Sequence, residues 1–584
     1  MDYALVAIGA IVVIVAAAAL APKLGIAAPL LLVVVGVGYS FIPGVPPIVI
    51  PPEWILAGVL PALLYAAAIN VPVVDLRRNL AAIASLSVVL VIASSLVVGF
   101  FLYYILPGLD LGAAIALGAV VSPTDAVAAT SIAKRLGLPA RLVTILEGEG
   151  LVNDATALVI LKSALAAVAL AAQGIEFDVW SAIWGFVFAV VVAVAIGLAV
   201  GILAVWVRRK LDNPMLDTAV SFAVPFVAFI PAEEVGASGV IAVVVTGLYS
   251  GYAGARQFTA QSRISERLNW RTVQFVIENG VFLVMGAQIS GIIATVHADD
   301  LSADQAAYLG LLVTLILLVL RYLFIAPLLF FTRRNEQRAE ARTSMLETLL
   351  VRLRKLGATE PSQSGKERIE RVVDRRHNDL AQLQAEGLGW RGGVVLGWAG
   401  MRGVVTLAAA QSLPKGTPYY EQLVLIAFTV AITTLLVQGG TLPWVIRLTG
   451  IRGTDRAADR RELAELLDEM SEAGIAALEN PKFDLPGDAR VDPAVIDRVR
   501  ADTLLGAEAA WERAKHADEE AGILQSPHQQ YRELRHEVLA AERVTLLDAR
   551  SRGAYPSRIL LRAQTMLDVE EARLQQMDTG GGAE

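Results

Sequence analysis

Hydrophobic residues occupy most of this chain in long, nearly uninterrupted runs, and charged residues fall mainly between the runs. About 20 apolar residues in a helix suffice to cross a hydrocarbon core about 30 Å thick. The pattern therefore predicts an all-α membrane protein with about thirteen transmembrane helices. We place these spans near 3–21, 24–42, 54–74, 80–106, 111–133, 142–171, 180–207, 214–231, 236–254, 272–294, 305–331, 392–413 and 420–446.

Basic residues alternate along the short loops between the spans. Loops after odd-numbered spans are rich in Lys and Arg. In the loops after even-numbered spans, the only basic residue is Lys415, and the other charged residues are acidic. Lys and Arg accumulate in cytoplasmic loops, so we expect the N terminus outside and the C terminus in the cytoplasm. Asp2, in place of a basic segment, precedes the first run, which favours a retained helix over a cleaved signal peptide.

Two polar segments stand apart from the spans. Residues 333–391 carry a net charge of +4 and are expected to form a cytoplasmic charged helical insert, broken around Gly357–Gly365. Residues 451–584 carry a net charge of −9 and show stretches of helical periodicity. We therefore divide the chain into a transmembrane domain, 1–450, and a cytoplasmic α-helical tail domain, 451–584. The tail is expected to regulate the protein or to stabilise a dimer.

Composition narrows the function further. Apolar residues make up 55% of the chain and charged residues 18%, which rules out a water-soluble enzyme for most of its length. There are no cysteines, and five scattered histidines give no metal-ligand spacing. Neither polar segment has the basic and aromatic texture of a nucleic-acid surface. No P-loop is present, so we expect no use of ATP, and no cofactor is implied.

Two predicted spans contain helix breakers near their middle. Span 111–133 contains Ser122-Pro123-Thr124-Asp125, where proline removes a backbone donor. Span 392–413 contains glycines at positions 392, 393, 397, 400 and 403. Irregular backbone at membrane depth persists only where it lines a polar cavity. Broken helices at corresponding places in two halves of a chain are typical of secondary transporters built from inverted repeats.

Charged residues inside the predicted spans are candidates for function, because a charge in a bilayer is costly unless it is paired or hydrated. The interior candidates are Asp125, Glu147, Glu149, Asp154, Lys162, Asp217, Glu278, Arg321 and Arg402. For Glu278, Lys162 and Arg321, structural pairing or a place at a helix end is an equal alternative.

Asp125 and Asp154 are expected at similar depth in the membrane. Asp154 lies 13 residues after the cytoplasmic turn at Arg141, about 20 Å along a helix. Asp125 lies nine residues before Lys134 on the neighbouring antiparallel span. Freed carbonyl groups and carboxylates supply the oxygen ligands that hard alkali cations prefer. The pair therefore predicts a site that holds either a proton or a cation; the alternative is a structural polar cluster.

Span 142–171 arranges its polar residues on two faces. Glu149 and Asn153 share one face, and Gly150 and Asp154 share another. Arg402, in the second broken span, keeps its charge and needs a buried anion. We expect it to pair with Glu149; snorkelling to the interface is the alternative.

The motifs VSPTDAVAAT, EGEGLVNDATALV and GMRGVV, in this order and spacing, closely resemble the cation:proton antiporter family that includes NhaP and the animal sodium/proton exchangers. The resemblance covers about residues 1–450. It implies a homodimer with an outer dimerisation domain and a mobile core, in which the two broken spans cross near the ion site.

The resemblance also assigns roles by position. Asp154 resembles the shared cation and proton carrier of the family, and Thr124 and Asp125 resemble its ligands at the unwound helix. Secondary candidates are Glu278 and Ser122, and the supporting network comprises Asn153, Glu149 and Arg402. The sequence departs from the family at Gly150, where many relatives have Ser, and at Ala66, where many have an acid.

The expected function is secondary antiport of Na+, K+ or Li+ against H+ by alternating access, in a multi-pass protein of the cell membrane. An Asn-Asp pair, as at 153–154, is the family pattern associated with electroneutral one-for-one exchange, and roles in pH and sodium homeostasis follow. The alternative is a cation channel or a cation and pH sensor on the same scaffold. A membrane-embedded enzyme is disfavoured, since no nucleophile–base pair is evident.

Overall fold

The structure is a computed structural model of the 584-residue chain. It describes residues 2–355 apart from 44–47, 49, 174–177, 212 and 297–300, then 388–451, 453 and 456–479, with short helical pieces between 493 and 571. The chain divides into two compact units, Met1–Ile451 and Arg452–Glu584.

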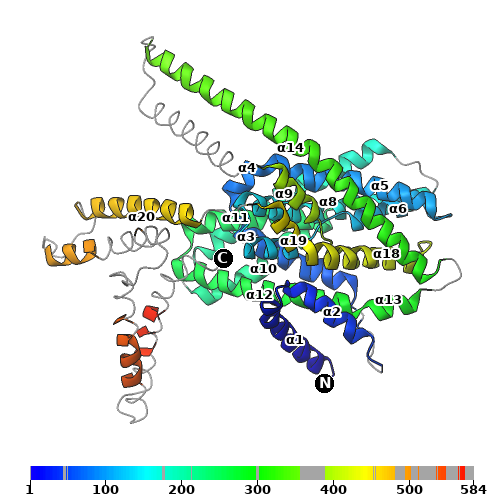
Figure 1. The fold of residues 1–584 in the computed structure, drawn as a ribbon, viewed down its shortest axis with the longest axis horizontal. Helices are drawn as coiled ribbons and strands as arrows, with labels where there is room; N and C mark the ends of the chain where they lie inside the picture. Colours follow the sequence, from blue (N-terminus) through cyan, green and yellow to red (C-terminus); the bar gives the residue numbers. More distant parts are fainter. Residues whose placement is uncertain are drawn as a thin grey trace. The chain divides into compact units, whose positions relative to one another are not determined.

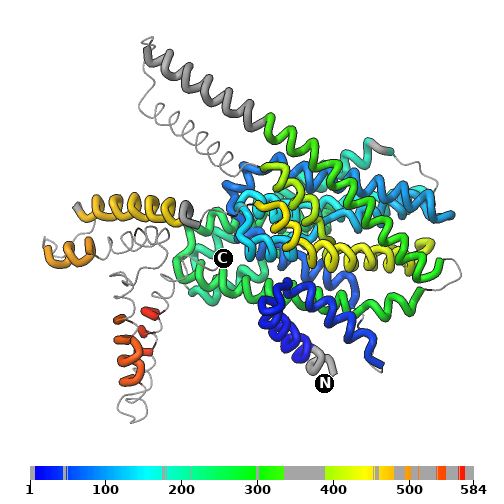
Figure 2. Tube along the Cα trace, in the orientation of Figure 1, coloured from blue at the N-terminus to red at the C-terminus, as the bar shows by residue number. Residues whose placement is uncertain are grey.

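Helices form every regular element of the first unit within the described residues (Figures 1 and 2). Some membrane segments consist of two or three consecutive helical elements, joined either directly or through an unwound break. The segments are α1 (Asp2–Leu24); α2 (Ala28–Ser40); η1 (Trp54–Val59) with α3 (Leu60–Asn70); α4 (Val73–Ala84), η2 (Ser85–Val89) and α5 (Leu90–Ile105); α6 (Leu111–Val121) and α7 (Ala126–Arg135); α8 (Ala140–Ala172); α9 (Val179–Arg208); α10 (Pro214–Glu234); α11 (Gly239–Gln257); α12 (Ala260–Ala287) and α13 (Ile289–Thr295); α14 (Ala303–Lys355); α16 (Trp390–Trp398) and α17 (Val404–Gln411); and α18 (Tyr420–Thr433), η3 (Thr434–Gly439) and α19 (Gly440–Thr449).

These segments correspond one by one to the thirteen predicted spans, so the predicted fold class is confirmed. Nine of the described segments are each long and apolar enough to cross a membrane on their own. Of the other four segments, Ala28–Ser40 and Trp54–Asn70 are shorter apolar helices, the segment of α16 and α17 is interrupted by an unwound stretch, and α11 is the remaining one. Helix length alone would therefore miss spans that the apolar pattern finds.

Buried apolar side chains of the first unit fall into two large clusters. One cluster joins α5, α6 and α7 to α14 and to the segments from α16 to α19, and it includes α8 residues before and after the middle of that helix, such as Leu142 and Leu161. The other joins α3, α9, α10 and α11, with Leu151 and Ala155 of α8 at its edge. Helix α8 therefore contributes to both clusters, and it carries the polar residues EGEGLVND between them.

The predicted polar segments are described in part. The first part of the insert continues α14, which runs unbroken to Lys355 (Figure 1), while the break expected around 357–365 lies outside the described residues. In the second unit, α20 spans Arg456–Glu479; Ala464 is buried, whereas Leu466 and Met470 are exposed. Most of the remaining tail also lies outside the described residues.

Candidate functional site

The two broken spans meet at their unwound stretches. Helix α6 ends at Val121 and α7 begins at Ala126; in the second segment α16 ends at Trp398 and α17 begins at Val404. The Asp125 N–H donates a hydrogen bond of 2.6 Å to the Met401 carbonyl. Backbone groups that lost their helical partners at one break are thus satisfied by the other, as irregular backbone inside a membrane requires.

A glycine makes this crossing possible. A Cβ atom added to Gly403 would lie within 2.8 Å of Asp125 Cβ and Cγ, and closer still to its Oδ2. Real Cβ atoms do not approach other atoms so closely. The Asp125 carboxylate therefore lies directly against the backbone at the start of α17.

Opposite charges lie at the opposite helix ends of the crossing. Asp125 caps α7, because its Oδ1 accepts a 2.8 Å hydrogen bond from the Val127 N–H. Arg402 Nε donates to the carbonyl of Val121, the last residue of α6, at 3.1 Å, and its Nη1 donates to the Gly400 carbonyl. An anion at a helix N terminus and a cation at a C terminus both offset the helix dipole. Both helix ends at the first break thereby have a charged group of the favourable sign.

The predicted pairing of Arg402 with Glu149 is wrong. Glu149 is buried and pairs with Arg321 of α14, whose Nη2 donates to Oε2 at 2.9 Å and whose Nη1 donates to Oε1. Arg402 is occupied by the helix-end carbonyls. Sequence reasoning underrated Arg321, although its place in the middle of the long apolar span 305–331 was a signal, since an arginine there is too deep to snorkel.

Arg321 connects three helices. Besides Glu149 of α8, it donates from Nε to the Leu396 carbonyl of α16 at 3.0 Å. A Cβ atom on Gly400 would lie 2.7 Å from Arg321 Cδ, so the glycine lets the arginine lie against the second break. The ion pair therefore holds α8, α14 and α16 together beside the crossing.

Thr124 and Asn153 extend this network to the first break. Thr124 Oγ1 donates to Glu149 Oε1 at 2.8 Å. Asn153 Nδ2 donates to the Thr124 carbonyl at 2.8 Å and to its Oγ1 at 3.0 Å. Asn153 Oδ1 is buried and accepts no hydrogen bond within the structure. An orphaned amide oxygen beside carboxylates suits a cation or an ordered water molecule.

Asp154 differs from its neighbours because its carboxylate is uncommitted. Among the described residues it has no hydrogen-bond or ion-pair partner, and its side chain is only partly buried. Asp125 lies within electrostatic range of it. A carboxylate with no fixed partner, next to a second carboxylate, is free to bind a mobile cation or a proton.

The secondary candidates lie near the crossing but have partners. Ser122 Oγ donates to the Gly118 carbonyl of its own helix at 2.6 Å. Glu278 of α12 accepts a 2.6 Å hydrogen bond from Gln274 Nε2, and Asp125 is within electrostatic range of its carboxylate. Glu278 therefore adds a carboxyl group from a neighbouring helix.

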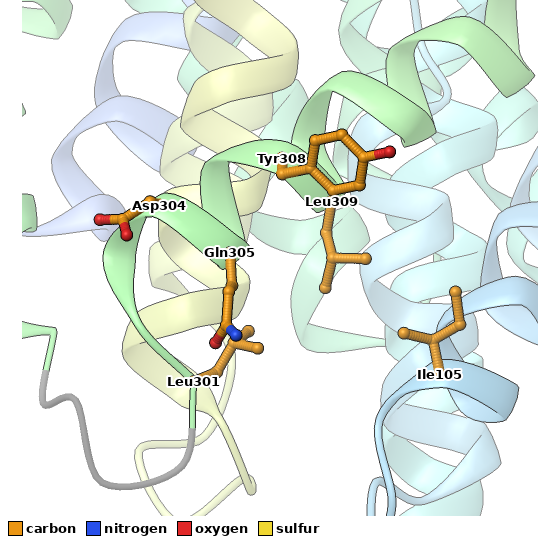
Figure 3. Close-up of a pocket in the computed structure, with 6 residues that line it drawn as sticks. All are labelled: Ile105, Leu301, Asp304, Gln305, Tyr308 and Leu309. Atoms are coloured by element: carbon orange, nitrogen blue, oxygen red, sulfur yellow. The ribbon is translucent and has the colours of Figure 1, made fainter.

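The remaining interior candidates are paired away from the crossing. Glu147 lies 3.1 Å from Lys134, Lys162 pairs with Glu233, and Asp217 pairs with Arg208. A hollow of about 360 Å³ lies elsewhere, at the end of α5 and the start of α14 (Figure 3). Its lining is mainly apolar and includes none of the predicted site residues: Ile105, Leu301, Asp304, Gln305, Tyr308 and Leu309.

The departure at Gly150 also has a structural explanation. A Cβ atom on Gly150 would lie 2.5 Å from Ala126 Cβ, so a serine hydroxyl could be placed there only if α7 moved. Ala66, the other departure, is fully buried in α3. The oxygen atoms available at the crossing are those of Asp125, Asp154 and Thr124 and of the backbone and amide groups beside them.

Two discontinuous helices that cross inside a membrane domain, with an uncommitted carboxylate and other oxygen-bearing side chains beside the crossing, are typical of a secondary transporter of small cations. The comparison with known sequences gives the family: the profile described as "Sodium/hydrogen exchanger, transmembrane" matches residues 9–448. The chain belongs to this family of cation/proton antiporters.

Relatives of similar length support this assignment. The uncharacterized Na(+)/H(+) exchanger Rv2287 of Mycobacterium tuberculosis is 30% identical, over 97% of this chain and 95% of the relative. The Na(+)/H(+) antiporter ApNhaP of Aphanothece halophytica is 29% identical, over 76% of this chain and 73% of the relative.

A solved structure shows the same fold. The sodium proton antiporter MjNhaP1 of Methanocaldococcus jannaschii matches with a TM-score of 0.53 over 76% of this chain and 99% of its own. The two are 15% identical in sequence, so this comparison supports the architecture alone.

Proposed function

We propose that the chain exchanges a monovalent cation for H+ at Asp154, with Asp125 and Thr124 completing the cation site. The observation that carries this assignment is the contrast between two neighbouring acids of α8. Glu149 is fixed by Arg321 and Thr124, whereas Asp154, five residues later, has no partner among the described residues. The fixed acid holds the helices, and the free acid binds the cargo.

Competition at one carboxylate produces obligatory exchange. A cation bound to Asp154 neutralises it, as a proton does, so both loaded forms cross the protein interior as neutral units, while the empty anion faces a large desolvation cost. Asn153 supplies an amide in place of a second acid, which supports one cation exchanged for one proton. Alternating access then moves the crossing helices relative to the scaffold.

Na+ is the leading substrate, and K+, Li+ and Rb+ belong in the same test. A Bacillus subtilis relative, 26% identical, is named a sodium, potassium, lithium and rubidium/H(+) antiporter. The alternating basic loops support an external N terminus and a cytoplasmic C terminus. We further propose that the protein forms a homodimer in the cell membrane and acts in pH and sodium homeostasis. The tail, 451–584, is assigned a regulatory role.

The test is cation-driven proton movement in acid-loaded proteoliposomes, followed with a pH-sensitive dye. We expect addition of Na+ to collapse the pH gradient in the wild type, and Asp154→Asn to lower the rate at least about 100-fold, because the carrier no longer titrates. Asp304→Asn, the same change at an exposed position, serves as the control.

Each outcome decides between mechanisms. Normal exchange by Asp154→Asn would remove Asp154 from the carrier role. Cation current without movement of protons would replace the exchanger by a channel. Equal loss of activity in Asp304→Asn would show that the assay responds to general damage to the protein instead of to the site.

A further inference from the structure

The start of α7 is held between two glycines, one in the second unwound stretch and one in α8. On one side Gly403, the residue before α17, lies against Asp125, as described above. On the other side a Cβ atom on Gly150 of α8 would lie 2.5 Å from Ala126 Cβ, 3.4 Å from its N and 3.5 Å from its Cα. Asp125 and Ala126 therefore have helix or loop backbone on both sides.

The contact at Gly150 governs the spacing of the two carboxylates. Gly150 lies one turn before Asp154 on the same face of α8, and Ala126 directly follows Asp125 in the chain. Carbon atoms pack favourably at about 3.5–4.0 Å, so one methyl group added at Gly150 must move the start of α7 by roughly 1 Å. Since Asp125 moves with α7, its distance from Asp154 changes with it.

Neither Gly150 nor Ala126 has a flexible side chain that could move aside for an added methyl group. Ala126 has only a Cβ atom, which has no rotamers, and the next nearest atoms are its own backbone. Gly148, on the same helix, is different: a Cβ atom there would meet the ends of the Ile83 and Leu76 side chains, at 2.5 and 3.0 Å. Those side chains can change rotamer, whereas the start of α7 can only shift as a unit.

We propose that the close contact of Gly150 with Ala126 sets the width of the cation site and is a specificity determinant for the size of the transported cation. A narrow site favours a small cation, and added volume at this contact shifts preference toward K+ and Rb+. The inference rests on the proposed exchange at Asp154 and identifies residues that touch neither cation nor proton; they act by positioning Asp125.

The contact can be tested by moving one methyl group across it. Gly150→Ala adds a methyl group on α8, and Ala126→Gly removes one from α7, so the double variant restores the total volume. Gly148→Ala is the matched control two residues away. For each protein the kcat/KM of exchange is measured for Na+ and K+ in proteoliposomes at one pH.

We expect Gly150→Ala to lower the ratio of kcat/KM for Na+ to that for K+ by about tenfold, the scale of discrimination that one methylene provides. The double variant should recover the wild-type ratio to within about threefold, and Gly148→Ala should keep it. An unchanged ratio in Gly150→Ala would overturn the inference. So would a double variant as altered as Gly150→Ala, because simple loss of packing would then explain both.

A binding measurement separates this inference from the proposed function. Stabilisation of the detergent-solubilised protein by Na+ and by K+ reports affinity without transport. If the wild type moves no protons but its cation-binding preference changes in Gly150→Ala, the proposed exchange is refuted and the proposed role of Gly150 in selectivity stands. If the wild type exchanges cations for protons but Gly150→Ala changes the preference in neither assay, exchange stands and the role of Gly150 is refuted.

Discussion

Two of the places where the membrane unit buries charged side chains differ in how completely the charges are paired. At the junction of α9, α10 and α12, Arg208 lies 2.7 Å and 3.1 Å from the two oxygens of Asp217 and 2.7 Å from Glu266. Its guanidinium also stacks 4.2 Å from the Phe258 ring. This Arg208 cluster holds one cation between two anions, so each of its carboxylates has a fixed cationic partner.

The crossing of α6–α7 and α16–α17 contains the same side-chain types in a looser arrangement. Glu149 and Arg321 are paired, but Asp154 has no partner among the described residues, and Asn153 Oδ1 is left without a donor. A pair that is already satisfied fixes helices, while a carboxylate left open can exchange one cation for another. In the proposed mechanism, a carboxylate without a fixed partner carries the ion, and a carboxylate with a fixed partner holds helices together.

Removing the arginine from each place should give the largest effects. Arg208→Met leaves Asp217 and Glu266 without their cation, and Arg321→Met leaves Glu149 without its own. Loss of one partner of a buried pair costs about 3–5 kcal/mol, so both variants should unfold at lower temperature. In Arg321→Met the rate of exchange per folded protein should also fall. In Arg208→Met the protein that remains folded should keep the wild-type order of preference among cations.

Thermal unfolding in detergent and exchange per folded protein measure these two quantities separately. An altered order of cation preference in Arg208→Met would show that the Arg208 cluster also affects the cation site, which would contradict the comparison. Undiminished exchange per folded protein in Arg321→Met would show that the Glu149 pair is structural only.

A hydroxyl deletion in each place should give an intermediate effect. Thr124→Val removes the donor to Glu149 and the acceptor for Asn153, which leaves buried groups unsatisfied at a cost of about 1–3 kcal/mol. Thr218→Val, beside Asp217, removes only a bond to the Pro214 carbonyl of its own helix. We expect a several-fold rise in the KM for Na+ in Thr124→Val alone. Equal KM values in the two variants would contradict a role for Thr124 at the site.

The smallest expected effect lies outside both places, at the start of α9. The hydroxyl of Ser181 and the N–H groups of Trp180 and Ser181 donate to Asp178 and hold the pKa of that carboxyl below its usual value of 3.8. Because the pKa is lowered in the fold, the stabilisation is present above about pH 4 and is lost as pH falls through the folded pKa.

Hydrogen exchange of the first turn of α9 measures this cap. Protection in the wild type should be lower at pH 3 than at pH 6, after correction for intrinsic exchange. Asp178→Asn, which caps without titrating, should show no such difference. A pH dependence that persists in Asp178→Asn would assign the effect to another group, and cation ranking should stay unchanged throughout.

Sequence alone was sufficient where local chemistry decides the outcome. Apolar runs located the spans, and Pro123 together with the glycines around Arg402 located the two breaks. These features depend on neighbours within a few residues, so their physical consequences are visible in the chain itself.

Contacts between helices that are distant in the sequence could not be predicted from it. Glu149 pairs with a residue 172 positions away, and the choice of Arg321 over Arg402 depends on how α14 lies against α8 and α16. The close contact between Gly150 and Ala126 depends likewise on the approach of α7 to α8. The assignments at Asp125, Asp154 and Thr124 remain predictions for transport measurements.

The continuity of α14 turns it into a lever. It is one helix of 53 residues, Ala303–Lys355, and Arg321 lies in its first half. At about 1.5 Å per residue, the portion after Arg321 extends about 50 Å. A rigid tilt of about 10° around Arg321 would therefore displace the far end by about 9 Å. A spectroscopic probe attached near Lys355 would magnify a rearrangement that is too small to resolve at the ion pair itself.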